Sequence, residues 1–293
     1  MKVLVVINPR SGKGRAGQLR EAAEAMAQQR GDTVEARIIR APGDGKRYAL
    51  EAVRSGVERL ISIGGDGTLN AVAAGLVGSA VRLGIVPVGS GNGYARSLKL
   101  PRDPGAALHL AFSGTARPMD VCYLNEHLFL GTAGIGFDAL VAREFDRSKG
   151  RGMRNYMRLT VKHLLCARPM RVVLKVNKQT REANLLMLVF CNTREFGNGA
   201  LISPASLPDD GMADLRLVSK PPLLPLLRSF LRMYAGTIDR SPYVQGISAD
   251  RATVHQSGTW AHLDGEPVEV GHEVQFRLEP GRLWVVDTDP ART

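Results

Sequence analysis

The sequence predicts an α/β N-terminal domain with a parallel sheet, followed by a β-rich domain. In the first 115 residues, short apolar strands alternate with helical patterns, as in a sheet built from right-handed crossovers. Three of these strands end in loops rich in Gly, Ser, Asn and Asp. Beyond Pro118 the predicted strands mostly follow one another directly. We therefore expect an α/β domain over residues 1–116 and a β-rich domain over residues 117–293.

The first unit begins with the apolar strand at residues 3–7 and continues into the polar loop at residues 8–14. An alanine-rich helix follows over residues 16–29, and Gly31 is placed to end it. The third unit has the same design, with a strand at residues 83–86, a loop at residues 87–93 and a helix that opens near Tyr94.

The second unit carries the most informative run of the chain. A buried strand at residues 60–63 leads into Gly64-Gly65-Asp66-Gly67-Thr68-Leu69-Asn70, and a helix is expected over residues 71–77. Glycines let backbone N–H groups approach a phosphate, and a helix N-terminus adds unpaired donors. A carboxylate beside a phosphate is repulsive unless a cation or a mobile proton lies between them. Asp66 therefore indicates phosphoryl chemistry rather than simple phosphate binding.

Neither of two common nucleotide motifs is present. The Walker spacing G-x-x-x-x-G-K-S/T is absent, and Gly89-Ser90-Gly91 lacks the third glycine of the dinucleotide fingerprint. One glycine loop alone is a weak signal, because tight strand-to-helix turns use Gly for steric reasons. Three such loops at neighbouring strand ends, one with an acid, favour a ligand site.

The second domain is expected to be mostly strands, with helices only near residues 139–165 and 222–235. The expected strands lie at residues 120–123, 127–132, 171–176, 185–191, 213–218, 252–255, 273–278 and 283–286. The apolar segment at residues 221–227 could contact acyl chains, but we interpret it as the start of a core helix with Pro in its first turn.

Composition is that of an ordinary cytoplasmic protein. The chain has 293 residues, 44% of them apolar, and no apolar run approaches a membrane span. The N-terminus does not have the pattern of a signal peptide. Cys122, Cys166 and Cys191 are scattered, and we expect reduced core residues rather than a disulfide or a metal site.

The net charge of +11 suits an anionic partner. Cations concentrate between Arg143 and Arg171 with apolar residues among them, which is typical of an amphipathic helix on an anionic membrane. The alternative is a solvated helix face. Only 5% of residues are aromatic and no nucleic-acid motif is present, so nucleic acid is not expected.

These motifs resemble the diacylglycerol kinase catalytic-domain family, which includes sphingosine kinases and bacterial soluble lipid kinases. The matching segments appear in family order at residues 8–12, 64–70, 89–92, 134–138 and 264–267. The resemblance implies a phosphofructokinase- or NAD-kinase-like first domain, a β-sandwich second domain, and transfer of the γ-phosphoryl group of ATP to a lipid hydroxyl. The basic segment between Arg143 and Arg171 suggests a peripherally membrane-associated protein, and a homodimer stays open.

The resemblance also implies site residues. Glu266 would be the general base with Asp264 as the fallback, Asp66 would hold Mg²⁺ through water or orient the acceptor, and Asp120 would lie near the acceptor head group. Leu207, Asp210 and Met212 resemble the family's structural Mg²⁺ loop, and a plain Asp-Gly turn is the alternative. The implied ATP-binding residues are Asn8, Pro9, Arg10, Ser11, Gly12, Gly64, Gly65, Asp66, Gly67, Thr68, Leu69, Asn70 and Ser90.

Gly93 departs from the pattern of diacylglycerol kinases, which carry an acid at this position. The acceptor is therefore open among diacylglycerol, a sphingoid base and another lipid alcohol. The alternatives to a lipid kinase are an NAD kinase, which shares the run at residues 64–68, and a non-catalytic nucleotide-binding regulator at membranes. The acids at positions 66, 120, 264 and 266 argue against the regulator.

Overall fold

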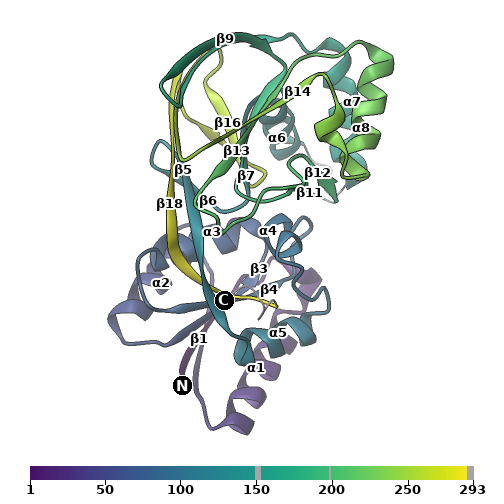
Figure 1. Cartoon of the computed structure of the whole chain (residues 1–293). Coiled ribbons are helices and arrows are strands. Elements are labelled where there is room, and N and C mark those ends of the chain that lie inside the picture. Colours follow the sequence, from purple (N-terminus) through teal and green to yellow (C-terminus); the bar gives the residue numbers. More distant parts are fainter. Residues whose placement is uncertain (149–152, 198, 289–293) are drawn as a thin grey trace. The chain divides into compact units, whose positions relative to one another are not determined.

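The computed structural model describes residues 1–148, 153–197 and 199–288, which form two compact units (Figure 1). Unit 1 comprises residues 1–120 and 281–293, and unit 2 comprises residues 121–280. The sequence-based division places residues 281–293 in the second domain. In the structure they belong to unit 1, because the end of the last strand pairs with a strand of the N-terminal sheet.

Unit 1 is a parallel α/β structure with the sheet order β2-β1-β3-β4, and the end of β18 lies parallel to β4. Helices α1 and α5 pack on one face of this sheet through Leu19, Ala23, Leu108 and Phe112. Its elements are β1 (Lys2–Ile7), η1 (Gly12–Gly14), α1 (Ala16–Arg30), β2 (Thr33–Ile38), α2 (Asp44–Arg54), β3 (Arg59–Gly64), α3 (Asp66–Leu76), β4 (Arg82–Pro87), α4 (Gly93–Ser97), α5 (Pro104–Ser113) and β5 (Ala116–Leu124), the last of which continues into unit 2.

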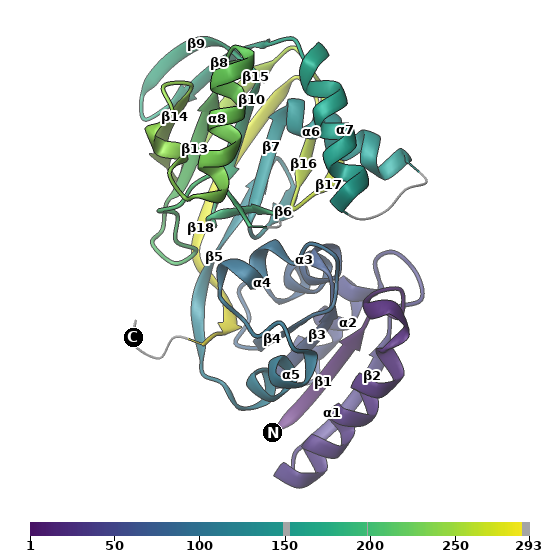
Figure 2. The same ribbon diagram turned by 90° about the vertical axis from the view of Figure 1, so that its right-hand side faces the viewer.

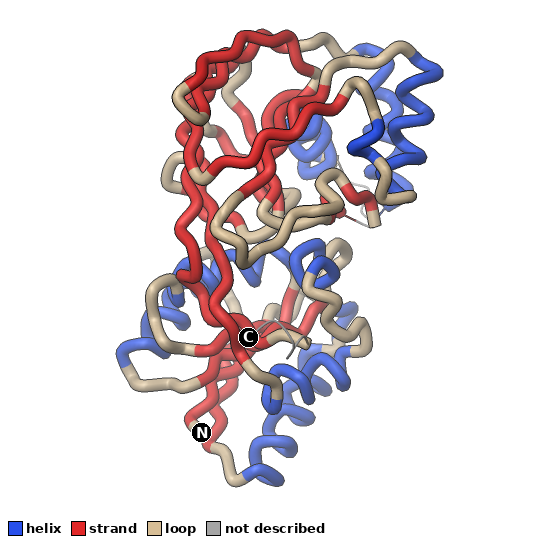
Figure 3. The backbone as a smooth tube through the Cα atoms, viewed as in Figure 1, coloured by secondary structure: helices blue, strands red, loops and turns tan. Residues whose placement is uncertain are grey.

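Unit 2 is rich in antiparallel strands (Figure 3). One sheet has the order β14-β13-β10-β7-β16-β17, and the facing layer contains β18-β15-β8-β9 with β5 and β6. The elements after β5 are β6 (His127–Phe129), β7 (Thr132–Gly136), α6 (Phe137–Arg147), α7 (Met153–Cys166), β8 (Met170–Val176), β9 (Gln179–Leu185), β10 (Met187–Cys191), β11 (Glu195–Gly197), β12 (Ala200–Leu201), β13 (Ala213–Val218), α8 (Leu223–Tyr234), η2 (Ile238–Arg240), β14 (Val244–Ala249), β15 (Arg251–Gln256), β16 (Trp260–Leu263), β17 (Glu266–Glu269) and β18 (Glu273–Val286).

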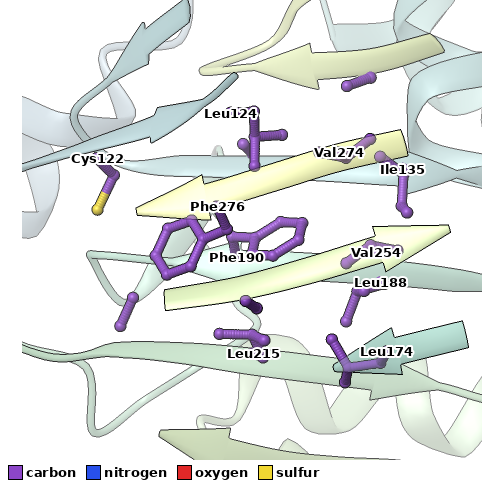
Figure 4. Close-up of a cluster of buried hydrophobic side chains, with 14 of the residues drawn as sticks. Cys122, Leu124, Ile135, Leu174, Leu188, Phe190, Leu215, Val254, Val274 and Phe276 are labelled. Atoms are coloured by element: carbon purple, nitrogen blue, oxygen red, sulfur yellow. The ribbon is translucent and has the colours of Figure 1, made fainter. Parts of the chain in front are cut away.

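Side chains from both layers form the core of unit 2 (Figure 4). Phe190 of β10 stacks on Phe276 of β18 with ring centroids 5.0 Å apart, and this contact joins the two layers. Helices α6, α7 and α8 lie on the outer face of the six-stranded sheet (Figure 2). The expected architecture of an α/β domain followed by a β-sandwich is confirmed.

Three local expectations were wrong. Helix α3 begins at Asp66 rather than Ala71, because Gly65 is extended and its carbonyl already accepts the N–H of Leu69. Cys166 is exposed, whereas Cys122 and Cys191 are buried. The segment at residues 221–227 is not simply a core helix start, since Leu224 of α8 is 80% exposed.

Candidate active site

The loops after β1, β3 and β4 come together in unit 1, because these strands are adjacent and parallel. Asn8 links the first two loops: its Nδ2 donates to Oγ1 of Thr68 at 2.8 Å. Its Oδ1 accepts the N–H of Arg10 at 3.0 Å, which fixes the turn of the first loop. A Cβ on Gly64 would lie 2.5 Å from Cβ of Thr68, so glycine is required for this approach.

The second and third loops touch backbone to backbone. A Cβ on Gly89 would lie 2.5 Å from Cα of Gly65, which no other residue would allow without a shift. Asn92 holds the third loop by accepting the N–H of Gly89 at 3.0 Å and donating to its carbonyl at 2.8 Å. The φ angle of Asn92 is 54°, a left-handed conformation that asparagine tolerates. The result is a surface of small residues with exposed Ser90 at its edge.

Asp66 is the first residue of α3 and is half-buried. A carboxylate in the first helical turn is favoured by the helix dipole. Its Oδ2 would lie 3.1 Å from a Cβ on Gly91, so the carboxylate faces the third loop. Leu69 of the Gly64–Asn70 run is buried. The polar side chains of this run are those of Asp66, Thr68 and Asn70. The three glycine loops therefore meet as expected, and the acid of the second loop faces the third.

Asp120 lies in β5 and is buried. Its Oδ1 accepts the N–H of Gly281 at 2.8 Å, so it ties two strands of the chain together. A role at the acceptor head group stays a prediction.

The acid pair of unit 2 lies on the hairpin between β16 and β17. Leu263 pairs with Glu266, and the two intervening residues both have positive φ, 49° for Asp264 and 90° for Gly265. An Asp-Gly pair with both φ values positive is the turn that suits the twist of a hairpin. Glu266 is the first residue of β17 and is exposed.

Asp264 is bonded to the backbone of another segment. Its Oδ1 accepts the N–H groups of Gly131 and Thr132 at 2.9 and 2.8 Å, and its Oδ2 accepts that of Leu130 at 2.9 Å. With three amide donors on one carboxylate, Asp264 holds the turn against the backbone of residues 130–132. Of the two acids, Glu266 is the one whose position suits a base, and the assignment stays a prediction.

One buried pair was missed by the sequence reasoning. Nε2 of His262 in β16 lies 3.2 Å from Oδ2 of Asp138 at the start of α6, and both residues are buried. The alignment of these two atoms is poorer than that of a regular hydrogen bond. Nδ1 of His262 accepts the N–H of Gly265 at 3.4 Å, so the histidine contacts the turn that carries Asp264. A glycine inside a strand, Gly134, was the available signal, because such glycines mark a close approach.

The candidate metal loop is only partly organised as a site. Oδ1 of Asp210 accepts the N–H of Met212 at 3.0 Å, as in a plain Asp turn. Burial raises the pKa of the Asp210 carboxyl, an environment in which a cation would restore the charged form. Over the described part of the chain, no three His, Cys, Asp or Glu side chains gather as a metal site. The predicted site differs from such a cluster, because it uses one carboxylate, that of Asp210, and the backbone carbonyls of Leu207 and Met212. It stays a prediction.

The basic segment forms two helices rather than one, α6 and α7. Positions 149–152, which include Lys149 and Arg151, lie outside the described residues. Arg143 packs over the ring of Trp260 at 4.8 Å, so this cation is part of the fold. Arg171 pairs with Glu182 at 2.8 Å.

Family models match both parts of the chain. Residues 2–124 match the diacylglycerol kinase catalytic domain, and residues 131–287 match the YegS C-terminal NAD kinase beta sandwich-like domain. The chain belongs to the YegS-type lipid kinase family. The predicted resemblance to lipid kinases is thereby confirmed. The protein is a kinase rather than a non-catalytic regulator.

Full-length relatives of this lipid kinase agree with the domain matches. A protein of Klebsiella pneumoniae named "Probable lipid kinase YegS-like" is 31% identical over 96% of this chain and 94% of its own length. "Probable lipid kinase YegS" of Salmonella arizonae is 30% identical with the same coverage. A crystal structure of a diacylglycerol kinase from Bacillus anthracis aligns over 100% of this chain and 98% of its own, with a TM-score of 0.73 at 20% identity. Another solved chain from that organism reaches a TM-score of 0.81 at 23% identity over the same shares, and both likenesses show the fold.

Proposed function

We propose that this lipid kinase transfers the γ-phosphoryl group of ATP to the hydroxyl of a lipid. The observation that carries the proposal is the meeting of three glycine loops, with the carboxylate of Asp66 facing the third of them. Gly89 lies so close to Gly65 that it could not carry a Cβ without a shift, and the backbone N–H groups of such glycine loops can approach phosphate oxygens. Phosphoryl transfer needs mainly such positioning and charge neutralisation.

The acceptor oxygen attacks the γ-phosphorus, the bond from phosphorus to the bridging oxygen breaks, and ADP leaves. We assign Glu266 as the base that takes the hydroxyl proton, because its neighbour Asp264 is occupied with three backbone amides. Asp66 would orient the acceptor or hold Mg²⁺ through water. Bound Mg²⁺ would neutralise charge on the transferred group, and a hard oxygen ligand such as the carboxylate of Asp66 suits it. Asp210 would hold a second, structural Mg²⁺ together with the carbonyls of Leu207 and Met212.

The acceptor class follows from the family and from Gly93. Relatives carry lipid kinase names, which leaves diacylglycerol, a sphingoid base or a related lipid alcohol. Gly93 is the first residue of α4 and supplies no acid beside Asn92, which departs from the pattern of diacylglycerol kinases and favours the wider class of lipid alcohols. The excess of cations suits peripheral contact with an anionic membrane at the cytoplasmic face. Among the helices that the structure describes, none is long and apolar enough to cross a membrane.

The test is transfer of labelled γ-phosphate from Mg-ATP into a total lipid extract, and the mass of the labelled lipid names the acceptor. Asp66→Asn should remove the label while the Tm stays near that of the wild type. The matched control is Asp103→Asn, at the N-cap of α5, where the side chain accepts the N–H of Ala106. It should keep full activity. Phosphorylation of added NAD without labelled lipid would instead support an NAD kinase.

A further inference from the structure

Helix α8 exposes a row of large apolar side chains. Leu224, Leu227, Leu231 and Tyr234 are 80, 58, 60 and 45% exposed, and we call these four residues the α8 stripe. Their spacing of three, four and three residues places them on one side of the helix. Single exposed apolar residues are common, but a contiguous row on one element marks an interaction site.

The opposite side of α8 attaches the helix to unit 2. Oγ of Ser229 lies 2.9 Å from Oγ of Ser241, and Nη1 of Arg232 donates to the carbonyl of Arg240 at 2.8 Å. Phe230 meets Tyr234 edge to face, with ring centroids 5.2 Å apart. Figures 1 and 2 show α8 on the outer side of the six-stranded sheet. The stripe is therefore the outward side of a helix held in place from behind.

The charged residues of the segment that carries the stripe are mostly cations. Residues 219–249 contain four cations, Lys220, Arg228, Arg232 and Arg240, and a single acid, Asp239. The carboxylate of Asp239 is paired with Nη1 of Arg216 at 2.7 Å. Arg228 is exposed and lies on α8 itself, and α8 contains no acidic residue. The chemistry complementary to this surface is apolar at its centre and anionic at its edge.

We propose that the α8 stripe inserts into the interface of a bilayer that contains anionic lipids. A second copy of the chain would bring like charges together around the stripe, which disfavours a two-fold contact. The helix has 12 residues, too few to span a bilayer but enough to lie in its interface. Apolar burial and a basic patch together give stable but reversible binding. The inference deepens the proposed function, because a lipid acceptor is held in a bilayer.

The test measures co-sedimentation with vesicles of phosphatidylcholine and phosphatidylglycerol, and with vesicles of phosphatidylcholine alone. The variant Leu227→Gln with Leu231→Gln should bind the mixed vesicles about tenfold more weakly or worse. The matched control is Leu50→Gln with Val53→Gln, two residues of α2 that are 39 and 38% exposed. It should bind as the wild type does. Arg228→Gln should weaken binding to mixed vesicles and leave binding to phosphatidylcholine unchanged.

A second readout does not depend on sedimentation. An environment-sensitive dye on Leu227→Cys, in a Cys166→Ser background, should brighten and shift to the blue on mixed vesicles. Unchanged binding of the double Leu variant, or a dye that stays in water while the protein binds, would overturn the proposal. So would a wild-type dimer that the double variant dissociates and that does not bind vesicles.

The vesicle measurements also separate this inference from the proposed kinase reaction. If stripe-dependent binding is observed but no lipid is labelled, the docking surface stands and the proposed reaction fails. If lipid in dispersed form is phosphorylated but the stripe variants bind vesicles normally, the reaction stands and the docking surface fails.

Discussion

Nε2 of His262 lies 3.2 Å from Oδ2 of Asp138, and the backbone of Gly134 passes directly beside both atoms. A Cβ at position 134 would overlap Oδ2 of Asp138 and would lie 2.9 Å from Nε2 of His262. The pair joins the start of α6 to the strand that precedes the Asp264-Gly265 turn. Since Nδ1 of His262 also accepts from Gly265, the helix, the strand and the turn meet at one buried polar contact.

Gly134→Ala should therefore destabilise the protein although it adds only one methyl group. The new Cβ must push Asp138 away from His262, and overpacking together with a disturbed buried pair costs about 3 kcal/mol. Urea unfolding measures the change. Gly17→Ala is the control, because the position is helical and, in the described part of the chain, no atom beyond its own helix backbone and its chain neighbours lies within 4 Å of the added Cβ. It should raise stability by up to ~1 kcal/mol, and equal effects of the two substitutions would contradict the argument.

Asp264→Asn and Glu266→Gln should distinguish the structural role of Asp264 from the catalytic role of Glu266. The Asn variant replaces a carboxylate that binds three N–H groups and should lose about 2–3 kcal/mol of unfolding free energy. The Gln variant alters an exposed residue at the start of β17 and should keep the wild-type stability while losing most activity. Chemical unfolding and lipid phosphorylation, measured on both variants, check this. A Gln variant with full activity would remove Glu266 as the base.

Mg²⁺ should stabilise the protein through Asp210 if the loop at residues 207–212 binds it. A ligand that binds only the native state raises the Tm, and the stabilisation grows with the logarithm of the ratio of its concentration to Kd. We expect a rise with Mg²⁺ in the wild type and none in Asp210→Asn, measured without nucleotide. Asp209→Asn is the matched control on the neighbouring residue. A rise of the same size in the Asp210 variant would show that the loop is a plain turn.

Acid should weaken the start of α2. Nη2 of Arg47 at 2.8 Å, together with the amides of Arg40 and Ala41, lowers the pKa of Asp44 to about 2. An unfolded Asp has a pKa of about 3.9. The pKa is depressed in the folded state, so the stabilisation is fully present above about pH 4 and is lost as the pH falls through 2.

The corresponding measurement is the Tm of the wild type and of Asp44→Asn across this pH range. The difference between them should be largest near neutral pH and should shrink toward pH 2. A constant difference would show that ionisation of Asp44 does not contribute.

The sequence by itself determined the local units of this lipid kinase. Strand, glycine loop and helix follow one another directly in the sequence, so the loops at residues 8–14, 64–70 and 87–93 could be recognised from composition and spacing. The order of parallel strands then required these loops to share one edge. Even here the start of α3 was misplaced, because Asp66 and Gly67 suit both a loop and a first helical turn.

Tertiary structure decided what distant residues do to one another. Asp264 and Leu130 are separated by 134 positions, and only the packing of two strands brings the carboxylate to the amide. His262 and Asp138 are likewise far apart, and neither carries a pattern that predicts a partner. The apolar run in α8 could equally serve a core or a surface, since periodicity gives the apolar side of a helix but not what that side faces. That choice depends on which side the rest of unit 2 covers, which is a property of the whole fold.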